Sequence, residues 1–143
     1  MLIKILPSQV VQFWEVIKFV STRVDEVDEK DLPKYLNELL HALLNEKAQC
    51  FVRLDDNREI IALSITRILK NKTTDEKYFQ VHCVYGFKSA SDEVWKKDWE
   101  VLRDFAKKEN CSYMGFMSRN SRIWDIAKLI GMTEAYRVFK LQL

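Results

Sequence analysis

The stretch Asn120-Ser-Arg-Ile-Trp-Asp-Ile-Ala-Lys-Leu-Ile-Gly131-Met132 does most to decide the fold of this chain. Apolar residues recur within it at a spacing of three, which is typical of one buried helix face. Gly131 suits the position just after a helix, where a left-handed backbone conformation is common. Residues 118–120 have turn chemistry, and residues 135–143 alternate between polar and apolar side chains. The end of the chain is therefore predicted to be a turn, a helix and a strand.

The rest of the chain switches between helical and strand-like spacing of its apolar residues. Strands are predicted at Leu2–Leu6, Cys50–Leu54, Glu59–Leu69, Tyr78–Phe87 and Cys111–Met117, and helices over Ser8–Val24, Asp31–Leu43 and from Ser91 or Asp92 to Asn110. The resulting order, β-α-α-β-β-β-α-β-α-β, predicts an α/β fold with a mixed, mostly antiparallel central sheet and helices on both faces. A length of 143 residues suits one domain, 1–143, because domains cluster near ~100–150 residues.

The composition excludes several classes of protein. Hydrophobic residues make up 48% and charged residues 31%, which rules out intrinsic disorder. The counts of 23 Lys+Arg and 21 Asp+Glu give a formal charge of +2, so we expect no nucleic-acid partner. No apolar run approaches the ~18–20 residues of a membrane-spanning helix, and residues 1–7 are too short for a signal peptide. We therefore expect a cytoplasmic protein with no membrane partner.

The three cysteines, Cys50, Cys83 and Cys111, lie far apart in the sequence. Their number is odd and their spacing matches no zinc motif, so we predict reduced thiols and no metal site. His41 lies on a leucine-rich predicted helix and is expected at the rim of that helix.

This order of elements, in a chain of this length, resembles the GNAT-type N-acetyltransferase family. The family pattern near the C-terminus is matched by Asn120, Ile123, Ile126, Gly131 and Met132. The predicted last strand also looks like that of the family. The lysine- and asparagine-rich style resembles small phage-encoded acetyltransferase-like proteins, some of which are packaged in virions. The resemblance implies transfer of an acyl group from acetyl-CoA or another acyl-CoA to an amine, in the cytoplasm or in association with a virion.

The first departure from the family pattern concerns the loop that holds the pyrophosphate of acetyl-CoA. The family has a Gln/Arg-x-x-Gly-x-Gly/Ala loop there, whose backbone amides bind the phosphates. In this chain the corresponding glycine positions are Ser91, Glu93 and Trp95. The carboxylates of Asp92 and Glu93 would repel a pyrophosphate, and the Trp95 ring would occupy its space.

The second departure concerns the general acid. Many family members place a tyrosine after the second apolar position of the last helix, where it protonates the departing thiolate of CoA. Ala127 stands at that position here. Tyr136 lies on the predicted last strand, so we do not transfer the role to it.

The resemblance still implies candidate residues for an acyl-CoA site. Val84 and Tyr85 would orient the acyl group, and Asn120 would approach the pantetheine arm. Ser89 and Ser91 lie in the segment that would bind the phosphates. This segment discriminates between the possible functions, because an enzyme needs free backbone amides there.

His82 is the candidate catalytic base, because histidine titrates near neutral pH and the residue lies inside the strand Tyr78–Phe87. Strict alternation along this strand predicts that His82 lies on the face opposite Val81, Cys83 and Tyr85. The alternative is a solvated or hydrogen-bonded strand histidine without a catalytic role.

Two tryptophans and a basic edge are candidate binding surfaces. Trp95 and Trp99 are one helical turn apart and would contact a protein partner or a second copy if exposed, although core packing also explains them. Arg119, Arg122 and Lys128 would meet a phosphate or form a solvated face.

An acidic segment between the first two predicted helices is a third candidate surface. It contains Asp25, Glu26, Asp28 and Glu29. Such a lining would favour a cationic amine or a basic protein partner, and the alternative is a solvated loop.

Two functions of different classes remain open. The departures favour a non-catalytic or weakly active GNAT-like domain, a pseudoenzyme that acts as a binding or structural protein and needs no cofactor. The alternative is an atypical acyl-CoA-dependent N-acyltransferase that acts on a cationic amine or a protein amine. Fold alone does not decide between them.

Overall fold

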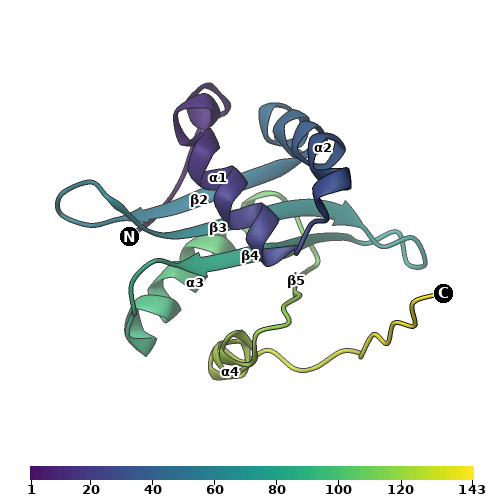
Figure 1. Cartoon of the computed structure of the whole chain (residues 1–143). Coiled ribbons are helices and arrows are strands. Elements are labelled where there is room, and N and C mark those ends of the chain that lie inside the picture. Colours follow the sequence, from purple (N-terminus) through teal and green to yellow (C-terminus); the bar gives the residue numbers. More distant parts are fainter.

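A five-stranded sheet forms the centre of the computed structural model, which describes residues 1–143 (Figure 1). Its strands are β1 (Leu2–Lys4), β2 (Ala48–Leu54), β3 (Ile60–Lys70), β4 (Lys77–Gly86) and β5 (Tyr113–Phe116). They lie in the order β1-β2-β3-β4-β5, and all neighbours are antiparallel except β4 and β5, which are parallel. The predicted mixed, mostly antiparallel sheet is confirmed.

Helices cover both faces of this sheet, as predicted. The α-helices are α1 (Val10–Val24), α2 (Leu32–Leu44), α3 (Asp92–Lys108) and α4 (Ser121–Leu129), and single 3₁₀ turns occupy Pro7–Gln9 and Glu29–Asp31. Side chains of α1 and α2 pack on one face, whereas α3 packs on the other. No helix has both the length and the apolar character needed to cross a membrane.

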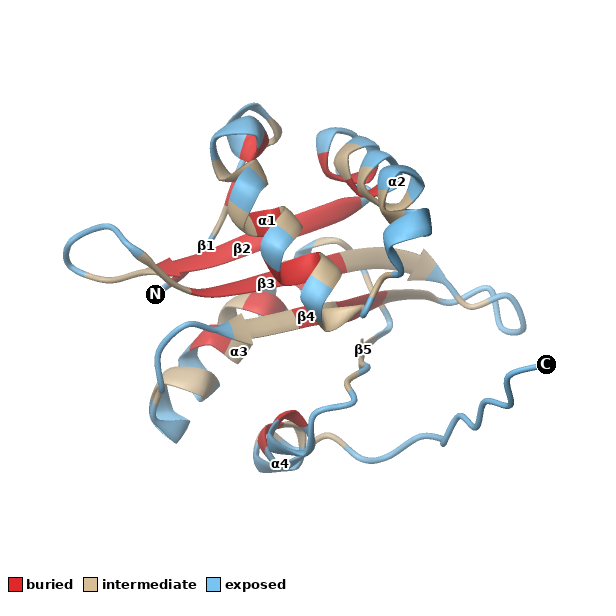
Figure 2. Cartoon of the chain, in the orientation of Figure 1, coloured by how far each residue is buried: buried red, intermediate tan, exposed pale blue.

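The core has two parts because the sheet is covered on both faces. The larger part joins α1 and α2 to the sheet through residues such as Ile17, Leu39 and Ile65. The smaller part joins α3 to the sheet through residues such as Phe79 and Leu102. Buried residues accordingly follow β2, β3 and β4 through the middle of the molecule (Figure 2). The cover on both faces also explains why β2 is buried without interruption from Ala48 to Arg53.

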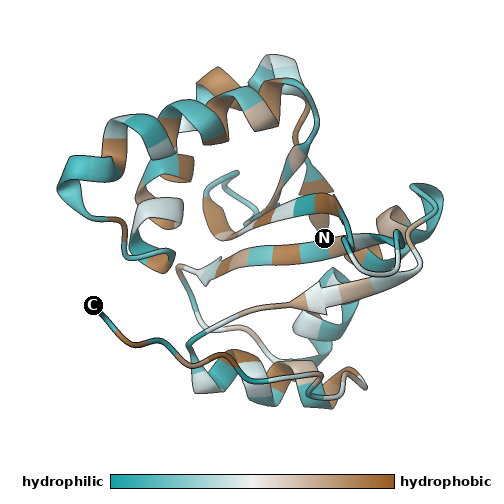
Figure 3. Ribbon diagram, turned by 90° about the vertical axis from the view of Figure 1, so that its right-hand side faces the viewer, coloured by the Kyte–Doolittle hydropathy of each residue, from teal (hydrophilic) through white to brown (hydrophobic).

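The predicted strand over residues 135–143 is not formed. This segment has no regular structure and pairs with no strand. Tyr136 is 71% exposed and Phe139 is 89% exposed, and polar and apolar bands follow one another along the segment (Figure 3). Strand-like alternation is therefore present without burial. Because strand preference is largely a preference for a half-buried surface, alternation alone does not make a strand.

A bulge interrupts the ladder between β3 and β4 at His82. Ile65 lies opposite Cys83 and Thr66 lies opposite Val81, so His82 has no partner on β3. The extra residue inverts the alternation of side chains along β4. Val81 therefore packs with α3, whereas Cys83 packs with α1 and α2.

Because of the bulge, His82 shares a face of the sheet with residues that were predicted to lie on the opposite face. Its ring contacts Asp25 at the end of α1, so it lies on the same face as Cys83. His82 is opposite Val81, as predicted. The predicted separation from Cys83 and Tyr85 is wrong, because simple alternation cannot anticipate an extra residue.

Candidate functional site

The sheet opens between β4 and β5 directly beside the bulge. The last pair between these strands is Val81 with Phe116, yet β4 continues to Gly86. Bulges bend a strand and increase its local twist, which explains why β5 does not follow β4 further. The edge of β4 from His82 to Gly86 is thus unpaired on this side, and the two faces of the opening carry different chemistry.

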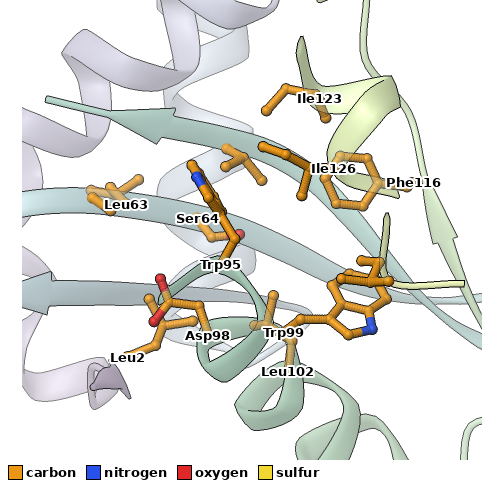
Figure 4. A pocket seen from close by; sticks show the side chains of 13 residues that line it. Leu2, Leu63, Ser64, Trp95, Asp98, Trp99, Leu102, Phe116, Ile123 and Ile126 are labelled. Atoms are coloured by element: carbon orange, nitrogen blue, oxygen red, sulfur yellow. The ribbon is translucent and has the colours of Figure 1, made fainter. Parts of the chain in front are cut away.

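On one face, a mostly apolar pocket lies between α3, α4 and the sheet (Figure 4). Trp95 and Trp99 reach it from α3, and Phe116 reaches it from the end of β5. The rest of its lining is Leu2, Ala62, Leu63, Ser64, Val84, Asp98, Leu102, Ile123, Ile126 and Ile130. Both tryptophans are half-buried, which supports the packing role that the sequence left open for them.

A buried ion pair lies beside this pocket. The Arg53 Nε donates a hydrogen bond to Asp98 Oδ2 over 2.8 Å, and the two side chains are 10% and 8% exposed. This pair ties β2 to α3. The Nη2 of Arg53 is also buried and has no hydrogen-bond partner. Sequence reasoning missed the pair, because neither residue belongs to a local motif.

The segment that precedes α3 takes a path that needs no glycine. None of the residues from Phe87 to Ser91 has a positive φ. Ser91 caps α3, since its Oγ accepts a hydrogen bond from the Val94 amide over 3.3 Å. The amides of Asp92 and Glu93 donate to no acceptor within the chain. Backbone donors are therefore free at this helix end, despite the missing glycines.

The two carboxylates at this helix end differ in their partners. Asp92 Oδ1 lies 3.7 Å from the Nη2 of Arg122 on α4. Glu93 is exposed and makes no ion pair. The negative charge that the sequence places here is thus partly balanced by the basic edge of α4.

The predicted acyl-CoA residues do not converge on one spot. Val84 lines the pocket, but Tyr85 lies on the opposite face of β4, where its ring meets that of Phe19 at 6.0 Å. Ser89 is exposed in the loop before α3. Asn120 caps α4, because its Oδ1 accepts a hydrogen bond from the Arg122 amide over 2.9 Å.

On the other face of the opening, three polar side chains meet. The Asp25 Oδ2 lies 2.8 Å from the Nε2 of His82, and it also accepts a hydrogen bond from the hydroxyl of Tyr35 on α2. The side chains of His82 and Asp25 are 29% and 21% exposed. The acidic segment was a predicted surface, but its contact with His82 and Tyr35 was not predicted.

The electrostatics of this cluster favour an ionised Asp25 and a protonated Tyr35 hydroxyl. Burial raises the pKa of Asp25, but the hydrogen bonds from His82 and Tyr35 outweigh burial and leave that pKa below its ordinary value. Burial and the Asp25 carboxylate raise the pKa of Tyr35, so its hydroxyl keeps its proton. An ionised Asp25 requires the proton of His82 to sit on Nε2. In the neutral imidazole, the Nδ1 of His82 then carries a lone pair, and it has no partner within the chain.

The neighbouring thiol is not a nucleophile. Cys83 is 1% exposed, and burial raises its pKa to about 12. Cys50 is equally buried, and burial raises its pKa to about 12 as well. These two thiols lie in the core, where all three cysteines were expected, and the expectation is wrong for Cys111. Cys111 is only partly buried.

The acidic segment is divided between internal contacts and solvent. Asp25 bonds to His82, and Glu26 forms a 2.8 Å ion pair with Arg119 before α4. Asp28 and Glu29 are exposed and make no ion pair. The α1–α2 connection thus borders the opening and keeps two free carboxylates beside it.

Solved structures of acetyltransferases share this arrangement of helices and strands. The ribosomal-protein-alanine N-acetyltransferase from Brucella melitensis biovar Abortus aligns with a TM-score of 0.69 at 14% identity, covering 100% of this chain and 99% of that chain. The aminoglycoside N-acetyltransferase AAC(6')-Iy, solved in complex with CoA, aligns with a TM-score of 0.69 at 12% identity, covering 100% and 98%. A GNAT family acetyltransferase from Staphylococcus aureus aligns with a TM-score of 0.64 at 15% identity, covering 100% and 98%.

No protein-family profile matches the sequence, and no curated protein matches it. At the identities of the solved structures, likeness establishes the fold alone. The chain has the GNAT-type acetyltransferase fold.

Proposed function

We propose that this chain transfers an acyl group from an acyl-CoA to an amine, with His82 as general base. The observation that carries the proposal is the position of the His82–Asp25 pair at the bulge where β4 and β5 separate. Amine acylation needs a group that takes a proton from the ammonium, and a histidine oriented by a carboxylate beside an opening in the sheet can supply one.

The proton chemistry follows from the tautomer of His82. An aliphatic amine is protonated at neutral pH and must lose a proton before it can attack a carbonyl carbon. The Nδ1 of His82 has the free lone pair to accept that proton. Asp25 holds the other ring nitrogen and stabilises the imidazolium that forms. Tyr35 orients Asp25 in turn.

The residues on the pocket face fit an acyl-CoA in part. The apolar lining around Val84 and Phe116 has the chemistry that an acyl group needs, although its cavity of about 30 Å³ has room for little more than a water molecule. The free amides of Asp92 and Glu93 suit a phosphate. Arg122 adds positive charge beside them. When bound, an acyl-CoA supplies the activated thioester. Against the fit stand the Glu93 carboxylate and the half-buried Trp95 ring.

The free carboxylates beside the opening indicate the class of acceptor. Asp28 and Glu29 lie on the α1–α2 connection, which borders the face of His82. A negative surface attracts a cationic substrate. A cationic small-molecule amine or a lysine-rich or N-terminal protein amine therefore fits this side.

Acetyl-CoA binding and acetyl transfer test the proposal together. We expect saturable calorimetric binding of acetyl-CoA and acetylation of a polyamine or a basic peptide, measured by mass spectrometry. His82→Gln should abolish transfer and leave binding unchanged, because His82 and the pocket lie on opposite faces. His41→Gln, at an exposed position of α2, is the matched control and should change neither. Transfer that survives in His82→Gln would refute the assigned base.

A non-catalytic binding domain is the second candidate, and Trp95 favours it. The Trp95 ring lines the apolar pocket between α3, α4 and the sheet, and so leaves less room there for an acyl-CoA. In that case the folded wild type does not bind acetyl-CoA. Pull-downs with wild type and Trp95→Ala would then identify a protein partner or a second copy at this surface. A cytoplasmic or virion-associated location goes with either candidate.

A further inference from the structure

The bulge on β4 brings three metal-ligating side chains together. Asp25, His82 and Cys83 each offer one ligand atom, and these atoms all lie within 4.8 Å of one another. Consecutive strand residues normally point to opposite faces, so His82 and Cys83 could not bind the same metal ion in a regular strand. The unpaired position of His82 opposite β3 removes that restriction. The convergence of the three donors is thus a product of the bulge.

We propose that Asp25, His82 and Cys83 form a zinc site at the bulge, with the fourth position open to water or to the Tyr35 hydroxyl. A carboxylate, an imidazole and a thiolate are the ligand types that zinc takes in proteins. The thiolate and imidazole exclude magnesium and calcium, which prefer oxygen ligands. Three protein ligands and one open position are the coordination pattern of an accessible zinc site.

The proton balance of binding is simple. The zinc ion bonds to the Cys83 sulfur, whose proton leaves to solvent. It bonds to the Nε2 of His82, whose proton moves to Nδ1. It also bonds to the Asp25 oxygen, which before zinc binds accepts the hydrogen bond from that ring. No oxidant or reductant is involved. Access is from the side of His82 and Asp25, whose side chains are 29% and 21% exposed, because Cys83 itself is buried.

This site has a consequence for the proposed function but does not depend on it. With zinc bound, the Nδ1 of His82 carries a proton and cannot accept one from an amine. Zinc and catalysis by His82 are therefore mutually exclusive. Metal binding is read by spectroscopy, so failure of the zinc site and failure of the proposed activity give different results.

Cobalt(II) titration of the full-length, metal-free protein tests the proposal, with cobalt as a spectroscopic probe for zinc. We expect one equivalent to bind, with visible absorption of a four-coordinate ion and a thiolate-to-cobalt charge-transfer band, both displaced by zinc. Cys83→Ser should lose the charge-transfer band. Cys50→Ser, an equally buried thiol in the same core, should keep it. A band that persists in Cys83→Ser, or no band in the folded wild type, would overturn the site.

His82→Gln provides a second measurement if Cys83→Ser does not fold. We expect this variant to bind cobalt at least roughly tenfold more weakly, since loss of an outer-shell partner alone costs that much. His41→Gln should bind like the wild type. Equal cobalt affinity of His82→Gln and the wild type would refute His82 as a ligand.

Discussion

Asp25 and His82 are 57 positions apart in the sequence, yet the Oδ2 of one lies 2.8 Å from the Nε2 of the other. The contact joins the end of α1 to the bulge on β4, beside the point where β4 and β5 separate. Tyr35 on α2 bonds to the same oxygen. One carboxylate therefore fixes the α1–α2 connection against the sheet and orients the candidate base.

Replacing Asp25 with Asn should destabilise the fold. The variant removes the charge from two hydrogen bonds that are half-buried, and hydrogen bonds to charged groups contribute roughly 1.5–3 kcal/mol each. Because Asn can still accept one bond, we expect a loss of about 1–2 kcal/mol in the free energy of unfolding in urea. Glu26→Gln is the control, since its ion pair with Arg119 is exposed. Equal losses in the two variants would contradict the assigned role of Asp25.

Breaking the Arg53–Asp98 ion pair from one side should be costly. Asp98→Ala leaves a buried guanidinium without its partner, which typically costs about 3–5 kcal/mol. The double variant Arg53→Met/Asp98→Leu should lose less than Asp98→Ala alone, because no uncompensated charge remains buried. Denaturant unfolding of wild type and the variants measures both. A double variant that loses as much free energy as Asp98→Ala would mean that the cost does not come from the unpaired guanidinium.

Asp55 should contribute to stability in a pH-dependent way. Hydrogen bonds from the amides of Glu59 and Asn57 lower its pKa below the ordinary value. A lowered pKa in the folded state means that the contribution is complete above the unfolded pKa of ~3.9 and is lost as pH falls through the folded pKa. The difference in unfolding free energy between wild type and Asp55→Asn should therefore shrink on acidification. Asp56→Asn, at a neighbouring position without such bonds, should show no comparable trend.

The three thiols should differ in reactivity. Burial raises the pKa of Cys50 and of Cys83 to about 12, and both are 1% exposed, whereas Cys111 is partly exposed. The thiolate is the reactive form. A disulfide reagent should therefore modify one thiol in the native protein and three in denaturant. Cys111→Ser should remove the native reaction, and a fast reaction in that variant would show that a core thiol is accessible.

Charges in the C-terminal segment should be tolerated. Val138 is 74% exposed and Leu141 is 83% exposed, so Val138→Asp and Leu141→Asp should change the unfolding free energy by less than about 0.5 kcal/mol. Val81→Asp, at a fully buried position of β4, is the contrasting control and should unfold the protein. Urea denaturation measures all three variants. A loss above roughly 1.5 kcal/mol for either tail variant would mean that this segment packs on the folded domain.

Much of the fold was readable in short windows of sequence. The stripe of Trp95, Trp99 and Leu102 predicted the inward face of α3, and all three line the same pocket. Ser91 was a predicted helix start and does cap α3. Spacing and cap chemistry act over a few residues, so they are encoded where they operate.

The candidate site was only partly readable. His82 was a candidate base, but its partners Asp25 and Tyr35 were not identified, and Tyr85 was placed on the wrong face of β4. Ser91 and Asn120 stay predicted donor-site residues, and the structure shows that their side chains cap helices. The partners of His82 and the face of Tyr85 depend on contacts between distant segments, whereas the two caps are local contacts.

The sequence by itself determined the order of the elements, the two-sided burial of the sheet and the missing glycines before α3. Only the tertiary structure decided where β4 bulges, which carboxylate meets His82, and that residues 135–143 stay unpaired. The physical reason is that a local pattern specifies a preference for helix or strand and for one buried face. The register of a strand, and the partner of a side chain, are set by whichever distant segments pack against it.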